Sequence, residues 1–214
     1  MFNVVRYNYS TNGVKMKNNR SRIVVGISGA SGSLLAAKTV DALLNKNVGV
    51  SLIASNPARM VWQHEMSMSY GESVEEWSYD NNFEHFAIGD FKAPIASGTY
   101  PTAGMAIVPS SMATISAVAK GLSDNLIRRA ADVCLKERRP LTMVPRESPL
   151  NAIHLGNMKY LATLGVTILP SDPPYYLPIT TLEEVANFTA QRILIALGIT
   201  DQLPEEMQYR GPII

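Results

Sequence analysis

Cysteine and histidine are scarce in this chain. Cys134 is the one cysteine among 214 residues, so the chain cannot form an internal disulfide or build a cysteine zinc site. The three histidines, His64, His85 and His154, lack the spacing of metal ligands, and we interpret them as structural residues. We therefore expect no metal, and we expect a reducing compartment, the cytoplasm.

Long apolar runs and an excess of one charge are also missing. The longest apolar runs, such as 23–27, fall far short of the roughly 20 residues that span a bilayer. A formal net charge of +1 gives no basic surface for a nucleic acid or an anionic membrane. Hydrophobic residues make up 46% of the chain, which excludes a disordered or fibrous protein. We expect a globular protein that binds neither nucleic acid nor membrane.

The two ends of the chain differ from its middle. Residues 1–21 contain basic residues but no acid, and they show no clear helical period, which predicts an N-terminal extension. Regular patterning begins at Arg22. We assign residues 22–199 to a single domain and 200–214 to a C-terminal tail, because the chain length suits one core.

Apolar runs alternate with helical patterns along this domain. Strands are expected at 23–27, 48–54, 105–109, 141–145 and 166–169, and helices at 34–44, 57–65, from 111, 124–138, from about 149, and 181–197. Asn56 is a plausible cap for the second helix, and Leu182 is expected on the apolar face of the last one. The stretch 67–82 is polar. This alternation predicts a parallel sheet covered by helices on both faces, with ligands at the carboxyl ends of its strands.

A glycine-rich loop, 26–33, follows the first strand and opens a helix. Its backbone N–H groups could hold a phosphate at the positive end of that helix. The loop lacks the Lys-Ser/Thr ending of a P-loop and the spacing of a dinucleotide fingerprint. Close packing of strand against helix explains the glycines equally well, so both interpretations stay open.

Two further polar loops accompany it. The segment 109–114 again follows a strand and caps a helix, so hydroxyl groups stand at two strand ends where sheet ligands bind. The segment 97–101 precedes that strand, and its simplest interpretation is a turn.

Cations gather in the helix expected at 124–138. Arg129 and Lys136 are seven residues apart and share one helical face, where they could grip an anion together. A solvated face with Asp132 and Glu137 as ion-pair partners is the interpretation that the sequence favours.

A carboxylate also stands at the ligand-binding edge. Arg146 and Glu147 follow the strand at 141–145, where Glu147 is suitably placed for proton transfer. Tyr175, Tyr176 and Arg192 offer further hydrogen-bond donors, although tyrosines in a proline-rich loop also serve packing.

Several segments resemble the UbiX-like flavin prenyltransferases. They are the glycine loop at 26–32, the run at 124–141, the segment 144–150 (Val-Pro-Arg-Glu-Ser-Pro-Leu) and the segment 153–158 (Ile-His-Leu-Gly-Asn-Met). The resemblance covers residues 22–199. It implies an α/β fold, a Rossmann-like or flavodoxin-like three-layer sandwich with a parallel sheet, in a homo-oligomer that is commonly a dodecamer with flavin between subunits.

The resemblance also implies a reaction. Members of the family join the dimethylallyl group of dimethylallyl phosphate to N5 and C6 of reduced FMN, and the prenylated FMN serves UbiD-like decarboxylases. No metal is implied. Whether the donor is the mono- or the diphosphate is left open.

Roles are carried over by position. The resemblance implies catalytic roles for Ser31, Glu65, Lys136 and Glu147; FMN binding by Gly29, Ala30, Ser31, Ser55, Ser111, Thr114 and Arg146; and binding of the prenyl phosphate by Ser97, Gly98, Arg129, Lys136, Tyr176 and Arg192. This chain departs from the family pattern in having Leu177-Pro178-Ile179 after Tyr176, and no tryptophan near the C-terminus.

Two other functions compete with this one. In the related cysteine-decarboxylase group a histidine and a loop like 109–114 are catalytic, and His85 stands in roughly that place, although the loop's asparagine is Ala113 here. A non-catalytic flavin carrier is the other alternative.

Overall fold

The computed structural model describes residues 22–209 and 211. The strands are β1 (Arg22–Ile27), β2 (Gly49–Ala54), β3 (Phe83–Phe86), β4 (Gly104–Ser110), β5 (Leu141–Pro145) and β6 (Thr167–Ile168). The helices are α1 (Ser33–Asn45), α2 (Asn56–Glu65), α3 (Tyr70–Trp77), α4 (Met112–Ala119), α5 (Leu126–Lys136), α6 (Ala152–Thr163) and α7 (Leu182–Ala196), with 3-10 turns at Pro94–Ala96 and Glu205–Met207. The predicted extension at 1–21 lies outside the described residues, and the division of the chain at 22, 199 and 200 stays a prediction.

The six strands form one sheet in the order β3-β2-β1-β4-β5-β6. All five strand pairs are parallel. This is the doubly wound Rossmann order, in which the direction of winding reverses between β1 and β4. The predicted parallel α/β sheet is confirmed, and its topological switch point lies between the two strands whose following loops carry the small polar residues.

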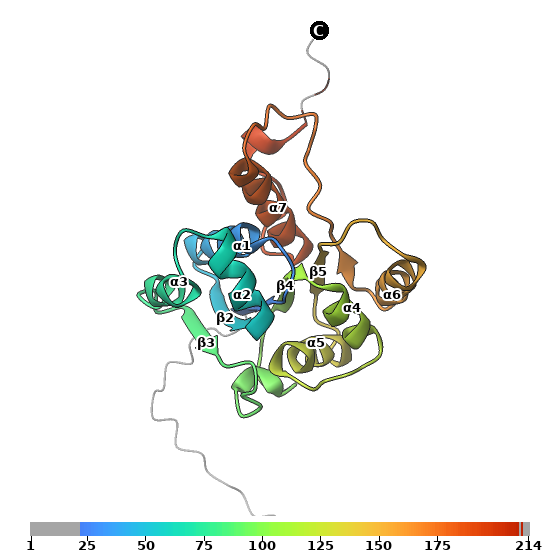
Figure 1. Ribbon diagram of the computed structural model, residues 1–214. Coiled ribbons are helices and arrows are strands. Elements are labelled where there is room, and N and C mark those ends of the chain that lie inside the picture. Colours follow the sequence, from blue (N-terminus) through green and yellow to red (C-terminus); the bar gives the residue numbers. More distant parts are fainter. Residues whose placement is uncertain (1–21, 210, 212–214) are drawn as a thin grey trace, which may run out of the picture.

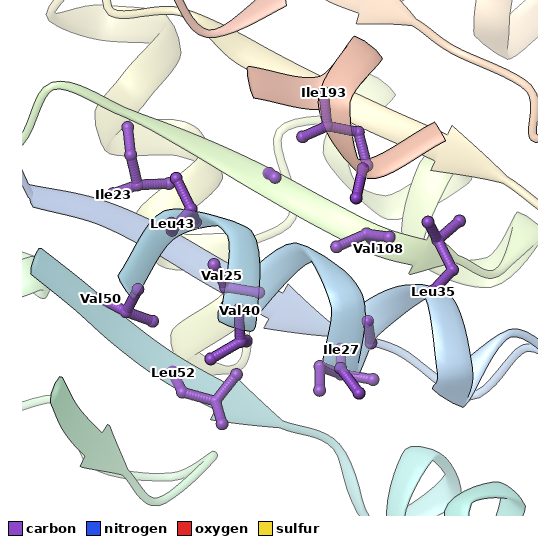
Figure 2. Packing of buried hydrophobic residues seen from close by; sticks show 14 of the residues in the cluster. Ile23, Val25, Ile27, Leu35, Val40, Leu43, Val50, Leu52, Val108 and Ile193 are labelled. Carbon is purple, nitrogen blue, oxygen red and sulfur yellow. The ribbon is translucent and has the colours of Figure 1, made fainter. Parts of the chain in front are cut away.

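The sheet has a hydrophobic core on each face because its side chains alternate. Ile23, Val25 and Ile27 of β1 face one core, while Val24 faces the other. Figure 2 shows the first core, where α1 and Ile193 of α7 lie against β1, β2 and β4. The second core takes its buried helical residues from α4, α5 and α6.

The molecule is therefore a three-layer sandwich (Figure 1). Helices α1 and α7 pack together on one side of the sheet and α4 and α5 cover the other. β3 with α3 and β6 with α6 lie at opposite edges. No helix among the described residues is long and apolar enough to cross a membrane, and the cytoplasmic location stays a prediction.

The polar stretch 67–82, to which the sequence analysis assigned no element, contains a helix. This is α3, whose N-terminus is closed by reciprocal hydrogen bonds between Ser69 and Glu72. The following β3 was also missed, and it pairs with β2 at the edge of the sheet. Both elements are short and partly polar, so their apolar periodicity is weak.

Two details of the helices differ from expectation. The cap of α2 is Ser55, whose hydroxyl accepts from the Ala58 N–H at 3.2 Å, and Asn56 is already helical. Leu182, expected on the apolar face of α7, is 81% exposed because it is the first helical residue and precedes the part that packs against α1. Ile193 and Leu197 are buried as expected.

Candidate active site

A cleft lies at the carboxyl edge of the sheet, beside the switch point. Its volume is about 380 Å³, within the range of roughly 300–1,000 Å³ that is usual for small-molecule sites. The loops after β1, β4 and β5 and the end of α2 line it, through Gly29, Ala30, Ser31, Val61, His64, Glu65, Ser111, Met112, Arg146 and Glu147. The structure thus brings together seven of the residues that the sequence proposed from four separate segments.

Three of the lining residues were missed. Val61 and Met112 are apolar, and nothing in the sequence separates them from core residues. His64 was interpreted as structural, yet it is exposed and lines the cleft one position before Glu65. Its place at the end of a helix that begins next to the glycine loop is the only signal that could have found it.

The glycine loop is held by an acidic residue from α2. Gly32 has a φ of 128°, a left-handed backbone that favours glycine, and as the N-cap of α1 it has no side chain to close the helix. The Glu65 carboxylate does so instead, accepting from the N–H groups of Gly32 at 3.0 Å and Ser33 at 2.8 Å. Glu65 therefore caps α1 from the neighbouring helix.

This contact fixes the charge of Glu65. Burial by itself raises the pKa of the carboxyl, but hydrogen bonds from the Ser31 hydroxyl and from the backbone of Ser33 and Gly32 outweigh it and hold the pKa below its usual range. Phosphate binding at these N–H groups, one of the two interpretations of the loop, is therefore disfavoured, since a carboxylate already occupies them.

Ser55 and Thr114 stand at the carboxyl ends of β2 and β4 but do not line the cleft itself. The hydroxyl of Ser55 caps α2. The Thr114 N–H donates to the Ser111 hydroxyl at 3.3 Å, and the hydroxyls of these two residues lie 3.1 Å apart. Of these two predicted FMN-binding residues, Ser55 thus caps α2 and Thr114 lies in the first turn of α4, next to Ser111 of the cleft lining.

Arg146 and Glu147 occupy the far side of the cleft. Both are exposed, and neither has an ion-pair partner among residues 22–209 and 211. The Arg146 N–H donates to the Ser110 carbonyl at 3.3 Å, which ties the loop after β5 to the end of β4. A guanidinium and a carboxylate are thus presented together toward the open cleft.

The cations on α5 already have partners within the chain. Arg129 pairs with Asp132 at 2.6 Å and donates to the Ala96 carbonyl at 3.0 Å, while Lys136 pairs with Glu137. The charged-face interpretation is confirmed for a single chain. Gly98 lies directly against the side chains of Lys136 and Glu137. Any larger residue at position 98 would collide with them.

Arg139 explains why this loop lies where it does. Its guanidinium donates to the carbonyls of Gly98 at 2.6 Å and Tyr100 at 2.9 Å, and to the Thr102 hydroxyl. Ser97 and Gly98 are therefore anchored beside Lys136. No role for Arg139 was predicted from the sequence.

Tyr176 and Arg192 lie at a third place. They line a separate cleft of about 540 Å³ between the segment 167–176 and α7. Arg192 has no ion-pair partner among the described residues. The ring of Tyr209 lies edge-on against the ring of Tyr176, with 5.6 Å between centroids. An aromatic residue of the tail thus contacts Tyr176, although the tail has no tryptophan.

Lys136 and Glu147 lie at opposite edges of the sheet within one chain. Lys136 ends α5 and precedes β5, at the amino edge, whereas Glu147 follows β5 at the carboxyl edge. β5 lies between them and has five residues, which span roughly 16 Å.

The other histidines have structural surroundings. His85 is on β3, with its ring against Tyr70 at 5.8 Å and its Nε2 buried. Burial, with a contribution from Arg59, lowers its pKa. His154 belongs to the cap of α6, where its N–H donates to Asn151 at 2.9 Å. Residues 22–209 and 211 contain no group of three or more His, Cys, Asp or Glu that could hold a metal ion.

The cleft at the switch point fits a flavin in its chemistry. Ser31 and Ser111 supply hydroxyl groups, Arg146 supplies a cation for a phosphate or a ring carbonyl, and Val61 and Met112 supply apolar surface for a planar ring. The fold and this cleft are those of a flavin-binding protein. In agreement with them, the flavoprotein family model matches residues 11–194.

Relatives narrow the class. The flavin prenyltransferase UbiX of Chlamydia pneumoniae is 40% identical over 188 residues, which cover 86% of this chain and 96% of that protein. The structure of AnUbiX (PadA1) in complex with FMN and dimethylallyl pyrophosphate is 36% identical with a TM-score of 0.79, covering 84% of this chain and 93% of that one. A dodecameric FMN-dependent UbiX-like decarboxylase from Escherichia coli O157:H7 is 33% identical with a TM-score of 0.81, covering 89% and 100%. The chain therefore belongs to the UbiX-like flavin prenyltransferase family.

Proposed function

We propose that this protein is a flavin prenyltransferase that joins the dimethylallyl group of dimethylallyl phosphate to N5 and C6 of reduced FMN. The observation that carries the proposal is the cleft at the switch point, where Ser31, Glu65, Arg146 and Glu147 meet in a chain 40% identical to a flavin prenyltransferase. Its product would be prenylated FMN, used by a UbiD-like decarboxylase.

FMN binds in this cleft. Gly29, Ala30 and Ser31 contact it from the loop after β1, Ser111 and Thr114 from the start of α4, Ser55 from the start of α2, and Arg146 from the loop after β5. Reduced FMN supplies the two nucleophilic ring atoms. The chain's task is to orient them toward the donor and to exclude water.

The donor phosphate is held by cations. An allylic phosphate leaves only when its developing negative charge is neutralised, which clustered cations and hydrogen-bond donors achieve in a dry site. Arg129, Lys136 and Arg192 supply the charge, and Ser97, the Gly98 backbone and Tyr176 supply further donors. Opening the ion pairs with Asp132 and Glu137 frees Arg129 and Lys136 for the phosphate.

Glu147 handles the proton. Departure of the phosphate accounts for one of the two new bonds, the one to N5. The second forms by addition of C6 across the prenyl double bond, whose other carbon takes up a proton while C6 loses its hydrogen as a proton. An exposed carboxylate beside Arg146 can carry this proton. Glu65 has a different role, because it is already committed to capping α1 and stays ionised.

The complete site is assembled from several subunits of a homo-oligomer. The separation of Lys136 and Glu147 at opposite edges of one sheet supports this proposal, and the dodecameric E. coli relative offers a model for the arrangement. A dodecamer is thus our proposal for this chain.

The test is anaerobic incubation with reduced FMN and either dimethylallyl monophosphate or diphosphate, followed by absorbance and mass spectrometry of the flavin. We expect one product, heavier than FMN by one prenyl group, and the faster donor identifies the phosphate form. Recovery of unmodified FMN with both donors would contradict the proposal and leave a flavin carrier.

An FMN-dependent decarboxylase is the second candidate, favoured by the name of the E. coli relative. Within one chain His85 lies on β3, packed against Tyr70 of α3; two strands, β2 and β1, separate β3 from β4, and His85 does not line the cleft. Carbon dioxide release from a peptide with a C-terminal cysteine, without prenyl transfer, would favour this candidate.

A further inference from the structure

Ser28 is a buried polar residue at the junction of the two loops that flank the switch point. It is 2% exposed and follows the last residue of β1. Its hydroxyl donates to the Pro109 carbonyl at 2.9 Å and accepts from the Ser111 N–H at 2.7 Å. Its own N–H also donates to the Pro109 carbonyl, at 3.2 Å.

These bonds join β1 and β4 beyond their last paired residues, Gly26 and Ile107. Proline has no N–H, so Pro109 cannot donate to a neighbouring strand and only accepts. The Ser28 N–H supplies one backbone bond here, and the Ser28 side chain adds the bond that reaches Ser111.

The joined loop carries the cleft wall. Ser111 caps α4, since its hydroxyl accepts from Thr114, and Ser111 and Met112 line the cleft opposite Gly29 to Ser31. The separation of these two walls therefore depends on Ser28. Because it is buried and absent from the cleft lining, Ser28 acts on a ligand only through its neighbours.

We propose that Ser28 is a positioning residue that sets the width of the flavin cleft by binding both Pro109 and Ser111. This inference rests on the proposed function. It assigns FMN affinity to a side chain that does not contact FMN.

The test compares Ser28→Ala with a matched control, Ser110→Ala. Ser110 is also a fully buried serine, but its hydroxyl donates to the Ile107 carbonyl within β4 and joins no second loop. Each protein is purified as the full oligomer, its Tm is measured, and FMN affinity is measured by fluorescence titration. Ser28→Cys fills the space with a thiol, which is a weak hydrogen-bond partner.

We expect both alanine variants to lose some thermal stability. The dissociation constant for FMN should rise about tenfold in Ser28→Ala and Ser28→Cys, about 1.4 kcal/mol, and should stay within about twofold of wild type in Ser110→Ala.

Equal FMN affinity in wild type and Ser28→Ala would overturn the inference, as would an equal loss in Ser110→Ala or restored affinity in Ser28→Cys. Should Ser28→Ala fail to fold, Ser28→Cys carries the same comparison. Failure of the wild-type protein to bind FMN would instead reject the proposed function.

Discussion

Two glutamates share the candidate active site and differ in their surroundings. Glu65 accepts hydrogen bonds from Gly32 and Ser33, so its charge is fixed by the backbone of α1. Among the residues that the structure describes, the Glu147 carboxylate accepts a hydrogen bond only from the adjacent Ser148 N–H, at 3.2 Å, and it lines the open cleft. These environments suit a structural role for Glu65 and the proposed proton-transfer role for Glu147.

The proton-transfer role predicts the behaviour of Glu147→Gln. The amide keeps the shape of the side chain and cannot accept a proton at neutral pH. We expect prenyl transfer to slow by about a hundred- to ten-thousandfold, while the FMN dissociation constant changes by less than about threefold. Stopped-flow absorbance under anaerobic conditions measures the rate, and wild-type speed in this variant would show that Glu147 only accompanies Arg146.

The phosphate-binding role predicts a loss of donor affinity in Lys136→Ala. Removing a charge-assisted contact of roughly 1.5–3 kcal/mol should raise the apparent dissociation constant of the donor about ten- to a hundredfold and leave FMN affinity unchanged. Lys120→Ala, at the end of α4, removes an equal charge away from the clefts and serves as the control. Loss of FMN with unchanged donor affinity would reverse the assignment.

Several cleft residues could be predicted from the sequence because polar side chains occur there directly after buried strands, where ligands of a parallel sheet bind. Ser31, Ser111 and Glu147 each follow a buried strand, and parallel strands bring their carboxyl ends to one edge. Ser28 escaped prediction because its partners, Pro109 and Ser111, are about eighty residues away. The proposed approach of Lys136 to the cleft of another subunit cannot be read from one chain, because within one chain the two lie at opposite edges of the sheet.

At the scale of elements, the structure couples α2 to α1 through Glu65. Because the folded-state pKa is lowered, the contact stabilises the fold fully above the usual value of 4.5, and this contribution disappears as the pH falls through the folded-state pKa. We expect Glu65→Ala to cost about 1 kcal/mol of unfolding free energy at pH 7, and the difference from wild type to shrink steadily in acid.

Urea unfolding across a pH series measures this difference. Glu76→Ala on α3 is the control. Glu76 is exposed, and its side chain makes no hydrogen bond or ion pair with the residues that the structure describes. This substitution should therefore change the free energy of unfolding little at every pH. A wild-type to Glu65→Ala difference that is independent of pH would show that the carboxylate charge does not matter to the cap.

The elements themselves were predictable where burial is complete. β1, β2, β4 and β5 are buried along nearly their whole length, and their apolar runs predicted them to within one or two residues. β3 has one fully buried residue and α3 has three, too few to produce a clear period. The Ser69 and Glu72 capping pair was the available signal for α3, since it depends on local spacing alone.

For the whole molecule, the positions of Lys136 and Glu147 predict that activity requires assembly. Lys136→Ala should bind the donor weakly and Glu147→Gln should transfer the prenyl group slowly, so at a donor concentration well below the dissociation constant of Lys136→Ala each variant alone should show little activity. If each site combines these residues from different subunits, oligomers formed by co-expressing the two variants should regain activity, at about a quarter of the wild-type value for random mixing. The mixed oligomers are isolated through two different affinity tags.

A site contained in a single chain predicts the opposite outcome. Every mixed oligomer would then contain only defective sites, and activity would stay at the level of the separate variants. The control is a mixture of the two variants that are purified separately and then combined. Its activity gives the background level, provided that the oligomers do not exchange subunits during the assay.

The contact between Tyr209 and Tyr176 has a practical consequence for anyone who prepares this protein. A purification handle fused shortly after Tyr209 would be tethered next to the cleft that Tyr176 and Arg192 line. A run of histidines held there is partly cationic and would itself attract phosphate groups, so it would change the measured affinity for a phosphate-bearing donor. Assays of the donor should use protein tagged at the other terminus, with the tag removed by a protease.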